Sequence, residues 1–267
     1  MVEVKAAIER HLVLIWPRSS LTASEQVEFT HRFGPPSPVP FIQPTAEHKE
    51  VIAISRLAEE APSFDPVGGW HSDFSFLAEP PSYTVLQAIN VPPFGGDTIW
   101  SNQYLAYETL SPLMQDFLAC LRADHSAMNA FGPSKQATFD ALDDADVVTG
   151  PDALERQQHP VVIAHQDSGR PTLYINREYT VGLSDLTAQE AQPLLDLLAH
   201  HTTRPEFTCR WRWSPGDLAM WDNRCLQHMA MTDYRGHARK MIRTTVHGSR
   251  PISLSEWTNG SKKGRRE

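Results

Sequence analysis

The chain has 267 residues, of which 40% are hydrophobic and 21% charged, and its formal net charge is −8. This length is enough for one large core, so we expect a single domain over residues 1–267, and the acidic balance argues against nucleic acid as a partner. No stretch approaches the ~20 apolar residues of a membrane-spanning helix. No signal peptide is visible either, so the sequence predicts a cytoplasmic protein without a membrane partner.

The first half of the chain predicts short elements separated by turns. The capping box Thr22-Ala23-Ser24-Glu25 opens a helix. The proline-rich stretch 35–48 is expected to be irregular and to line a pocket. Helices are predicted over 2–11, 23–33, 101–110 and 111–121, and strands over 12–16, 51–54, 70–76 and 83–91.

The second half of the chain repeats this pattern of short strands. An acidic stretch, 132–156, predicts a mobile loop or a helical insertion. Strands are predicted over 159–164, 173–175, 207–213, 218–221 and 241–246, with one helix over 187–201. Many short strands with few helices predict a mainly β fold, a sandwich or barrel with flanking helices. A basic tail closes the chain, and we expect about 255–267 to be disordered.

The chain contains three cysteines, Cys120, Cys209 and Cys225, without a CxxC pair. This sparse, odd count argues against a disulfide framework and for a reducing compartment. Cys225 lies three residues before His228, so the two could share a zinc ion. The more frequent alternative is a small buried residue in a strand.

The pair His71 and Asp73 carries the main chemical signal. Two imidazoles and one carboxylate can occupy one face of an Fe(II) ion and leave the other face open for a co-substrate and O2. Residues i and i+2 of a strand point to the same side, so both could reach one metal. We expect the third ligand to be His228, which follows Trp221-Asp222-Asn223. The alternative is a chance pair of surface or core residues.

Two arginines follow His228 at spacings of 11 and 15 residues, Arg239 and Arg243. Their even separation puts both on one face of the last predicted strand. A guanidinium suits bidentate binding of a carboxylate, phosphate or sulfonate, and the Thr98 hydroxyl could share such an anion. The alternative is that these arginines form surface salt bridges.

Together these motifs resemble the TauD/TfdA family of Fe(II)- and 2-oxoglutarate-dependent dioxygenases. The similarity covers almost the whole chain, from Leu21 to Val246. Its landmarks are Trp70-His71-Ser72-Asp73, Gly95-Gly96-Asp97-Thr98, His159-Pro160-Val161, Gly169-Arg170, Leu173-Tyr174-Ile175-Asn176, Trp221-Asp222-Asn223, Gln227-His228 and Arg239 through Arg243.

The resemblance implies a double-stranded β-helix, the jelly roll of cupin-like proteins, and an enzyme that converts 2-oxoglutarate and O2 to succinate and CO2 while it hydroxylates a substrate. It implies Fe(II) bound by His71, Asp73 and His228. It also implies that Thr98 and Arg239 hold the distal carboxylate of 2-oxoglutarate, while Arg243 binds the acidic group of the substrate. The family usually has a strand segment ahead of its first helix, whereas we expect this chain to start almost directly in that helix, and none of these residues falls ahead of it.

The residues matching the family's substrate pocket are apolar or aromatic: Val39, Ile42, Val67, Phe74, Phe131 and Tyr179. An apolar cavity around one cation suits an amphiphilic carboxylate. The pattern is similar to the aryloxyalkanoate (dichlorprop-type) branch, which hydroxylates the carbon beside the ether oxygen of a small anionic substrate. Alternatives are a taurine, alkyl sulfonate or alkyl sulfate dioxygenase and a non-catalytic, cupin-like metal-binding protein. The sequence leaves open whether the protein forms a homo-oligomer.

Overall fold

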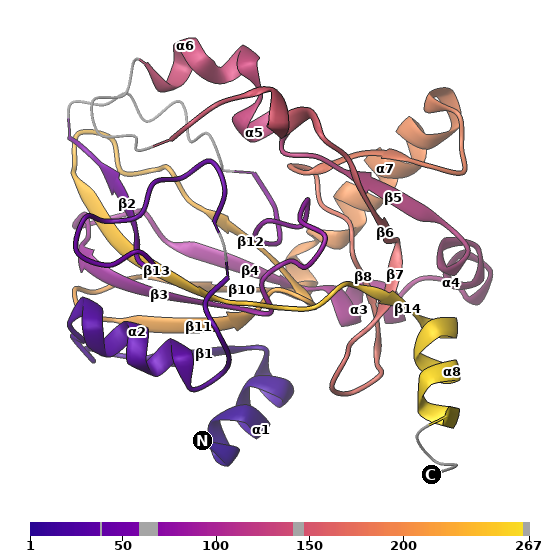
Figure 1. The fold of residues 1–267 in the computed structure, drawn as a ribbon, viewed down its shortest axis with the longest axis horizontal. Coiled ribbons are helices and arrows are strands. Elements are labelled where there is room, and N and C mark those ends of the chain that lie inside the picture. The colour runs from indigo at the N-terminus through magenta and orange to yellow at the C-terminus, as the bar shows by residue number, and fades with distance from the viewer. Residues whose placement is uncertain (38, 59–68, 141–146, 264–267) are drawn as a thin grey trace.

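The computed structural model describes residues 1–37, 39–58, 69–140 and 147–263 (Figure 1). The helices are α1 (Val2–His11), α2 (Ala23–His31), α3 (Gln103–Glu108), α4 (Pro112–Ala119), α5 (Met128–Phe131), α6 (Gln136–Phe139), α7 (Ala188–Thr202) and α8 (Leu254–Lys263), with 3-10 turns η1 (Pro133–Lys135), η2 (Pro151–Leu154) and η3 (Pro205–Phe207). The strands are β1 (Val13–Trp16), β2 (Ile52–Arg56), β3 (Tyr83–Asn90), β4 (Thr98–Asn102), β5 (Arg122–His125), β6 (Gln157–Pro160), β7 (Val162–Ala164), β8 (Pro171–Leu173), β9 (Thr180–Leu183), β10 (Thr208–Trp211), β11 (Leu218–Asp222), β12 (Leu226–Ala230), β13 (Arg239–Val246) and β14 (Ile252–Ser253). The predicted mainly β fold with flanking helices is confirmed.

Two antiparallel sheets form the half of the molecule that carries the site. The larger has the order β1-β11-β3-β13-β2 and the smaller the order β10-β4-β12. Buried residues from both sheets share one core cluster, in which Trp100 of β4 and Trp221 of β11 meet with ring centroids 5.7 Å apart. The aromatic contact across the two sheets fixes β12 and β13 on opposite sides of the same interior.

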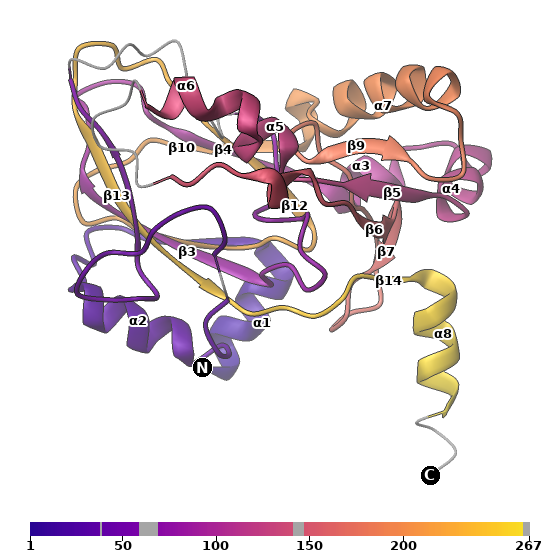
Figure 2. The same cartoon turned by 45° about the horizontal axis from the view of Figure 1, so that its top comes forward.

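The other half holds two small sheets, β14-β7-β8 and β6-β5-β9, with α3, α4 and α7 beside them (Figures 1 and 2). Its core includes Leu118 of α4, Leu198 of α7 and Val162 of β7, all fully buried. α7 has the capping box that its sequence predicts, because Thr187 and Glu190 bond each other's backbone N–H groups.

Two predicted elements are wrong. Residues 70–76 do not form a strand: His71 makes a single antiparallel bridge to His228, and a turn follows in which Phe74 has φ +49°. The tail, predicted to be disordered from about 255, is helical as α8 up to Lys263, because Ser253 and Glu256 bond each other's backbone N–H groups and cap its first turn. Residues 264–267 lie outside the described part of the chain.

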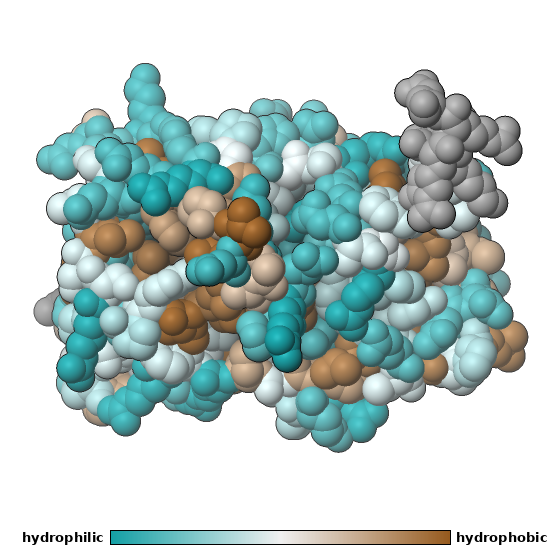
Figure 3. All heavy atoms as spheres, turned by 90° about the horizontal axis from the view of Figure 1, so that it is seen from below, coloured by the Kyte–Doolittle hydropathy of each residue, from teal (hydrophilic) through white to brown (hydrophobic). Residues whose placement is uncertain are grey.

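In the predicted insertion over 132–156, the described residues form three short helical segments, η1, α6 and η2, and a non-helical stretch over 147–150. Seen from below, hydrophobic residues gather in one patch on the side of α1 and α2, and polar residues surround it (Figure 3). Among the described helices, none has the length and apolar character that crossing a membrane requires.

Candidate functional site

His71, Asp73 and His228 meet between the two sheets. His228 lies on β12, and the His71 and His228 backbones exchange two N–H···O bonds of 3.0 and 2.7 Å. Asp73 follows in the turn, so that one nitrogen or oxygen of each of the three side chains lies within 4.8 Å of the others. All three residues are buried. The chain thus builds this group from a bridge and a turn, where the sequence predicted a strand.

The chemistry of these three groups suits a metal ion. The Nδ1 of His71 lies 2.7 Å from the Gly69 carbonyl and donates to it, which leaves Nε2 as the free ligand atom. Nε2 of His71 and Nε2 of His228 lie 3.7 and 3.9 Å from the same Asp73 oxygen, Oδ1. Two imidazole nitrogens and one carboxylate oxygen that can bind the same face of a metal ion are the donor set expected for non-haem Fe(II).

The protonation states of these groups follow from burial and their neighbours. Burial and the neighbouring His71 lower the pKa of His228 to about 3, so its ring is neutral near pH 7. Burial alone would raise the pKa of Asp73, but Arg243 and the two imidazoles outweigh it and hold this pKa well below its usual range. Burial lowers the pKa of His71, yet the Asp73 carboxylate outweighs this and leaves it raised. A carboxylate and a neutral imidazole are the forms that bind cations.

Arg239 and Arg243 both lie on β13 and are buried, 6% and 7% exposed, so neither is a surface residue. The Nη1 of Arg243 lies 3.1 Å from Asp73 Oδ1, and its guanidinium sits 4.9 Å above the Phe74 ring. The Nε and Nη2 atoms of Arg243 are buried and have no hydrogen-bond partner among the described residues. A buried guanidinium with unused donors is suited to receive an anion.

The turn before β4 brings Thr98 into the same region. The Thr98 oxygen accepts a 3.0 Å bond from Trp213 Nε1, which leaves its own hydrogen to donate. Gly96 has φ +69°, and a Cβ on it would lie 3.2 Å from Cδ and Nε of Arg239. Only glycine therefore lets this turn approach the Arg239 side chain so closely.

Of the residues expected to bind substrate, some lie next to the metal-binding group or Arg243 and others belong to the aromatic cluster around Phe41. Tyr179 meets the His71 ring edge-on at 5.9 Å, and Phe74 lies under Arg243. Phe131 is a layer further out, stacked on Phe41 at 5.3 Å. Ile42 is half-buried and packs against this aromatic cluster, and Val39 is half-buried as well. Val67 lies outside the described residues.

Two further polar residues stand directly behind the carboxylate, and the sequence reading missed them. Thr84 donates a 2.6 Å bond to Asp73 Oδ2, and Asn223 Nδ2 donates a 2.8 Å bond to Thr84. Asn223 also accepts from the Trp221 indole at 2.9 Å. A fully buried threonine inside the apolar run of β3 was the available signal, because buried polar groups need partners.

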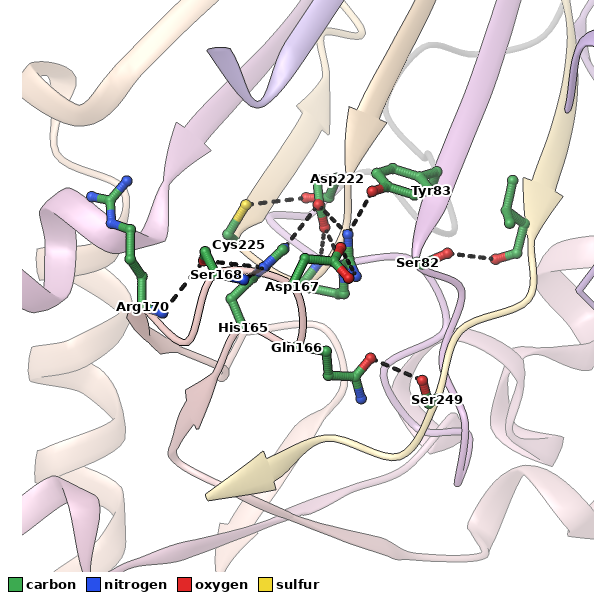
Figure 4. Close-up of polar contacts among 12 residues, drawn as sticks. Ser82, Tyr83, His165, Gln166, Asp167, Ser168, Arg170, Asp222, Cys225 and Ser249 are labelled. Carbon is green, nitrogen blue, oxygen red and sulfur yellow. Dashed lines mark hydrogen bonds and ion pairs between the residues drawn. The ribbon is translucent and has the colours of Figure 1, made fainter. Parts of the chain in front are cut away.

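A second group of potential ligands, His165, Asp222 and Cys225, is buried about the end of β11 (Figure 4). The Asp222 oxygens are already engaged: His165 Nε2 lies at 3.0 Å, and Arg224 forks onto both at 2.9 and 2.7 Å. Burial raises the pKa of the Cys225 thiol well above its usual value, so it stays protonated. These contacts describe a structural network that ties the 165–170 turn to β11. Cys225 is buried, as expected, but lies in the turn between β11 and β12 rather than in a strand.

Comparisons with known proteins agree with this geometry. Residues 1–245 match the family model described as taurine catabolism dioxygenase TauD, TfdA family. The chain is 32% identical to an alkylsulfatase of Acinetobacter baylyi, over 91% of this chain and 75% of that protein. It is also 32% identical to the alpha-ketoglutarate-dependent 2,4-dichlorophenoxyacetate dioxygenase of Cupriavidus pinatubonensis, over 90% and 86%. The crystal structure of a taurine dioxygenase from Burkholderia xenovorans superposes with a TM-score of 0.77 at 33% identity, covering 94% of this chain and 82% of that one. The chain belongs to the TauD, TfdA family of dioxygenases.

Proposed function

We propose that this protein is an Fe(II)- and 2-oxoglutarate-dependent dioxygenase in which His71, Asp73 and His228 hold the iron. The observation that carries the proposal is the buried group of two imidazoles and one carboxylate within 4.8 Å, with a buried arginine at its side. Bound iron would supply the activation of O2 that is coupled to decarboxylation of 2-oxoglutarate to succinate and CO2.

Thr98 and Arg239 would hold the distal carboxylate of 2-oxoglutarate. The free hydrogen of the Thr98 hydroxyl and the buried Arg239 guanidinium support this assignment, since both donate to an anion. The close approach of Gly96 to Arg239 fixes where that guanidinium lies. These residues bind and orient the co-substrate, and their burial excludes water from it.

Arg243 would bind the anionic group of the substrate and so decide which carbon faces the metal. Its unused Nε and Nη2 donors and the aromatic rings of Phe74 and Tyr179 favour a small amphiphilic anion. We expect hydroxylation of a C–H next to a heteroatom, with aryloxyalkanoate-like carboxylates as the first candidates. Alkyl sulfates and sulfonates are the second, because one relative is named an alkylsulfatase and one solved structure a taurine dioxygenase.

We further assign the two sheets to a double-stranded β-helix. All their strand pairs are antiparallel, and the two sheets enclose one shared core. In this arrangement His228 comes from the smaller sheet and Arg243 from the larger. A site between two sheets of one jelly roll explains how residues 155 to 170 positions apart in the sequence meet at Asp73.

The direct test is an anaerobic titration with Fe(II) and 2-oxoglutarate, followed in the visible region for the metal-to-ligand charge-transfer band. We expect the band with the natural chain and its loss in Asp73→Ala, while Asp196→Ala on the exposed face of α7 serves as control and keeps it. A succinate-release screen over aryloxyalkanoates, sulfonates and alkyl sulfates then separates the two substrate classes. A band of full intensity in Asp73→Ala would refute the metal assignment.

A further inference from the structure

A cavity lies next to the segment that follows Asp73. Its volume is about 650 Å³, which is within the range of ordinary small-molecule pockets. Two segments far apart in the sequence form one wall, because Val148 N–H donates a 2.8 Å bond to the Phe41 carbonyl and Ile42 bridges Val147. Phe76 and Leu77, which follow the Asp73 turn, line it as well.

The chemistry of the lining favours an apolar occupant. Pro40, Phe41, Phe76, Leu77 and Ala127 contribute hydrophobic surface, and Gln43 and Thr149 add uncharged polar groups. The charged residues of the lining are Asp152 and Glu155, both exposed at its rim, and none of the described lining residues is Lys, Arg or His. An anionic group is therefore disfavoured here, whereas an uncharged hydrocarbon or aryl group is not.

Phe76 lines this cavity and also contacts aromatic residues that lie next to the metal-binding group. Its half-buried ring lies 4.9 Å from Tyr179, whose ring meets His71, and 5.9 Å from Phe74, which lies under Arg243. The same ring faces Phe41 at 6.0 Å on the cavity side. Phe76 thus joins the cavity lining to two aromatic rings, of which one contacts a metal ligand and the other the anion-binding arginine.

We propose that this cavity takes the apolar end of the substrate and that Phe76 limits how much of that end can enter. The proposal rests on the function proposed above, because it places the anionic group at Arg243. A molecule bound there through its anion directs its uncharged end away from Arg243, and the cavity beyond Phe76 accepts it. Phe76 is then a specificity-determining residue that sets the length and width of accepted anions.

The first experiment measures occupation of the cavity without turnover. The uncharged dye N-phenyl-1-naphthylamine, which fluoresces in apolar surroundings, is titrated into the natural chain and into Val148→Trp, a change that fills the cavity from its rim. We expect binding to weaken by about tenfold or more. The control is Leu113→Trp on α4, where the side chain is 81% exposed and far from the cavity lining. Equal affinity in Val148→Trp and the control would overturn the proposal.

The second experiment measures selectivity over straight-chain alkyl sulfates from butyl to decyl and over phenoxyalkanoates of increasing length. In Phe76→Ala we expect kcat/KM for the longest members to rise by about tenfold or more relative to the shortest, with Phe76→Leu between it and the natural chain. In the double variant Phe76→Ala, Val148→Trp, the kcat/KM of the longest members relative to the shortest should fall back toward that of the natural chain. An unchanged ratio in Phe76→Ala and Phe76→Leu with native circular dichroism would overturn the proposal.

The two proposals fail in different ways. If no anion in either series releases succinate with the natural chain, the proposed substrate class is wrong, and the dye titration still decides whether the cavity binds apolar groups. If succinate is released, but Val148→Trp leaves the dye affinity unchanged and Phe76→Ala leaves the chain-length preference unchanged, the dioxygenase assignment stands and the cavity proposal is wrong.

Discussion

The Nη1 of Arg243 lies 3.1 Å from Oδ1 of Asp73, the carboxylate oxygen that also faces both imidazoles. The arginine therefore touches the proposed metal ligand and leaves its remaining donors for an anion. One side chain thus keeps the carboxylate ionised and offers a binding point for substrate charge. Because Arg243 contacts the proposed metal ligand Asp73, an anion bound to Arg243 is held at a fixed position relative to the metal.

We expect Arg243→Ala to weaken substrate binding by about 2–5 kcal/mol, the cost of removing one partner of a buried charge contact. Decay of 2-oxoglutarate without substrate hydroxylation should continue slowly, because Thr98 and Arg239 are intact. The measurement compares substrate affinity with succinate and hydroxylated product, counted separately. Arg243→Lys keeps the charge but loses the fork and should recover only part of the affinity. Unchanged affinity in Arg243→Ala would remove the anion-binding role.

Gly96→Ala should weaken 2-oxoglutarate binding, because its Cβ would lie 3.2 Å from Cδ and Nε of Arg239 and displace that side chain. We expect a loss of about tenfold in affinity, or about 1.4 kcal/mol, read from the charge-transfer titration. Gly236→Ala is a matched control: its φ is +78°, against +69° at Gly96, and it has no heavy atom within 4 Å of the added carbon. If both variants weaken binding equally, backbone strain and not contact with Arg239 is responsible.

The site residues could be predicted from sequence because they are spaced by simple strand geometry or by family motifs. Arg239 and Arg243 lie on one strand, as predicted, but their even separation did not predict that both are buried. The reason given for His71 and Asp73 was wrong, however: they meet through a bridge and a turn rather than along a strand. A turn with φ +49° at Phe74, a residue with a large side chain, leaves no signal in an alternation of polar and apolar residues.

What escaped prediction depends on contacts between distant segments. Thr84 and Asn223 are 139 positions apart, and only folding shows that they form a chain of hydrogen bonds ending at Asp73. The cavity beyond Phe76 likewise needs the pairing of Phe41 with Val148. The tail was predicted to be disordered from its basic residues alone, and the Ser253 and Glu256 cap that starts α8 was not recognised.

Thr84→Val keeps the shape of a buried β-branched side chain and removes the hydroxyl that donates to Asp73 Oδ2 at 2.6 Å. We expect metal affinity to fall by about 10–100-fold, as for other residues that orient a ligand. Competition with a fluorescent chelator, using Mn(II) in place of Fe(II), measures this change. Thr172→Val is the matched control, since Thr172 is also fully buried but its hydroxyl donates to the neighbouring Leu173 carbonyl, at 3.4 Å, and not to a ligand carboxylate. A loss of the same size in both variants would argue for a general packing effect.

Stability should fall as the pH drops from neutral, and His159 accounts for part of this fall. Burial lowers the pKa of His159 from its ordinary 6.5 to about 4, so the unfolded chain binds a proton between these values that the folded chain does not. The free energy of unfolding therefore decreases as the pH falls from about 6.5 to about 4, by roughly 3 kcal/mol for this group. His159→Gln removes the titration and keeps a donor for the Leu77 carbonyl, 2.9 Å away in the natural chain. Urea unfolding at pH 7 and pH 4.5 should then show a smaller loss in the variant than in the natural chain, and equal losses would mean that His159 does not oppose protonation in the fold.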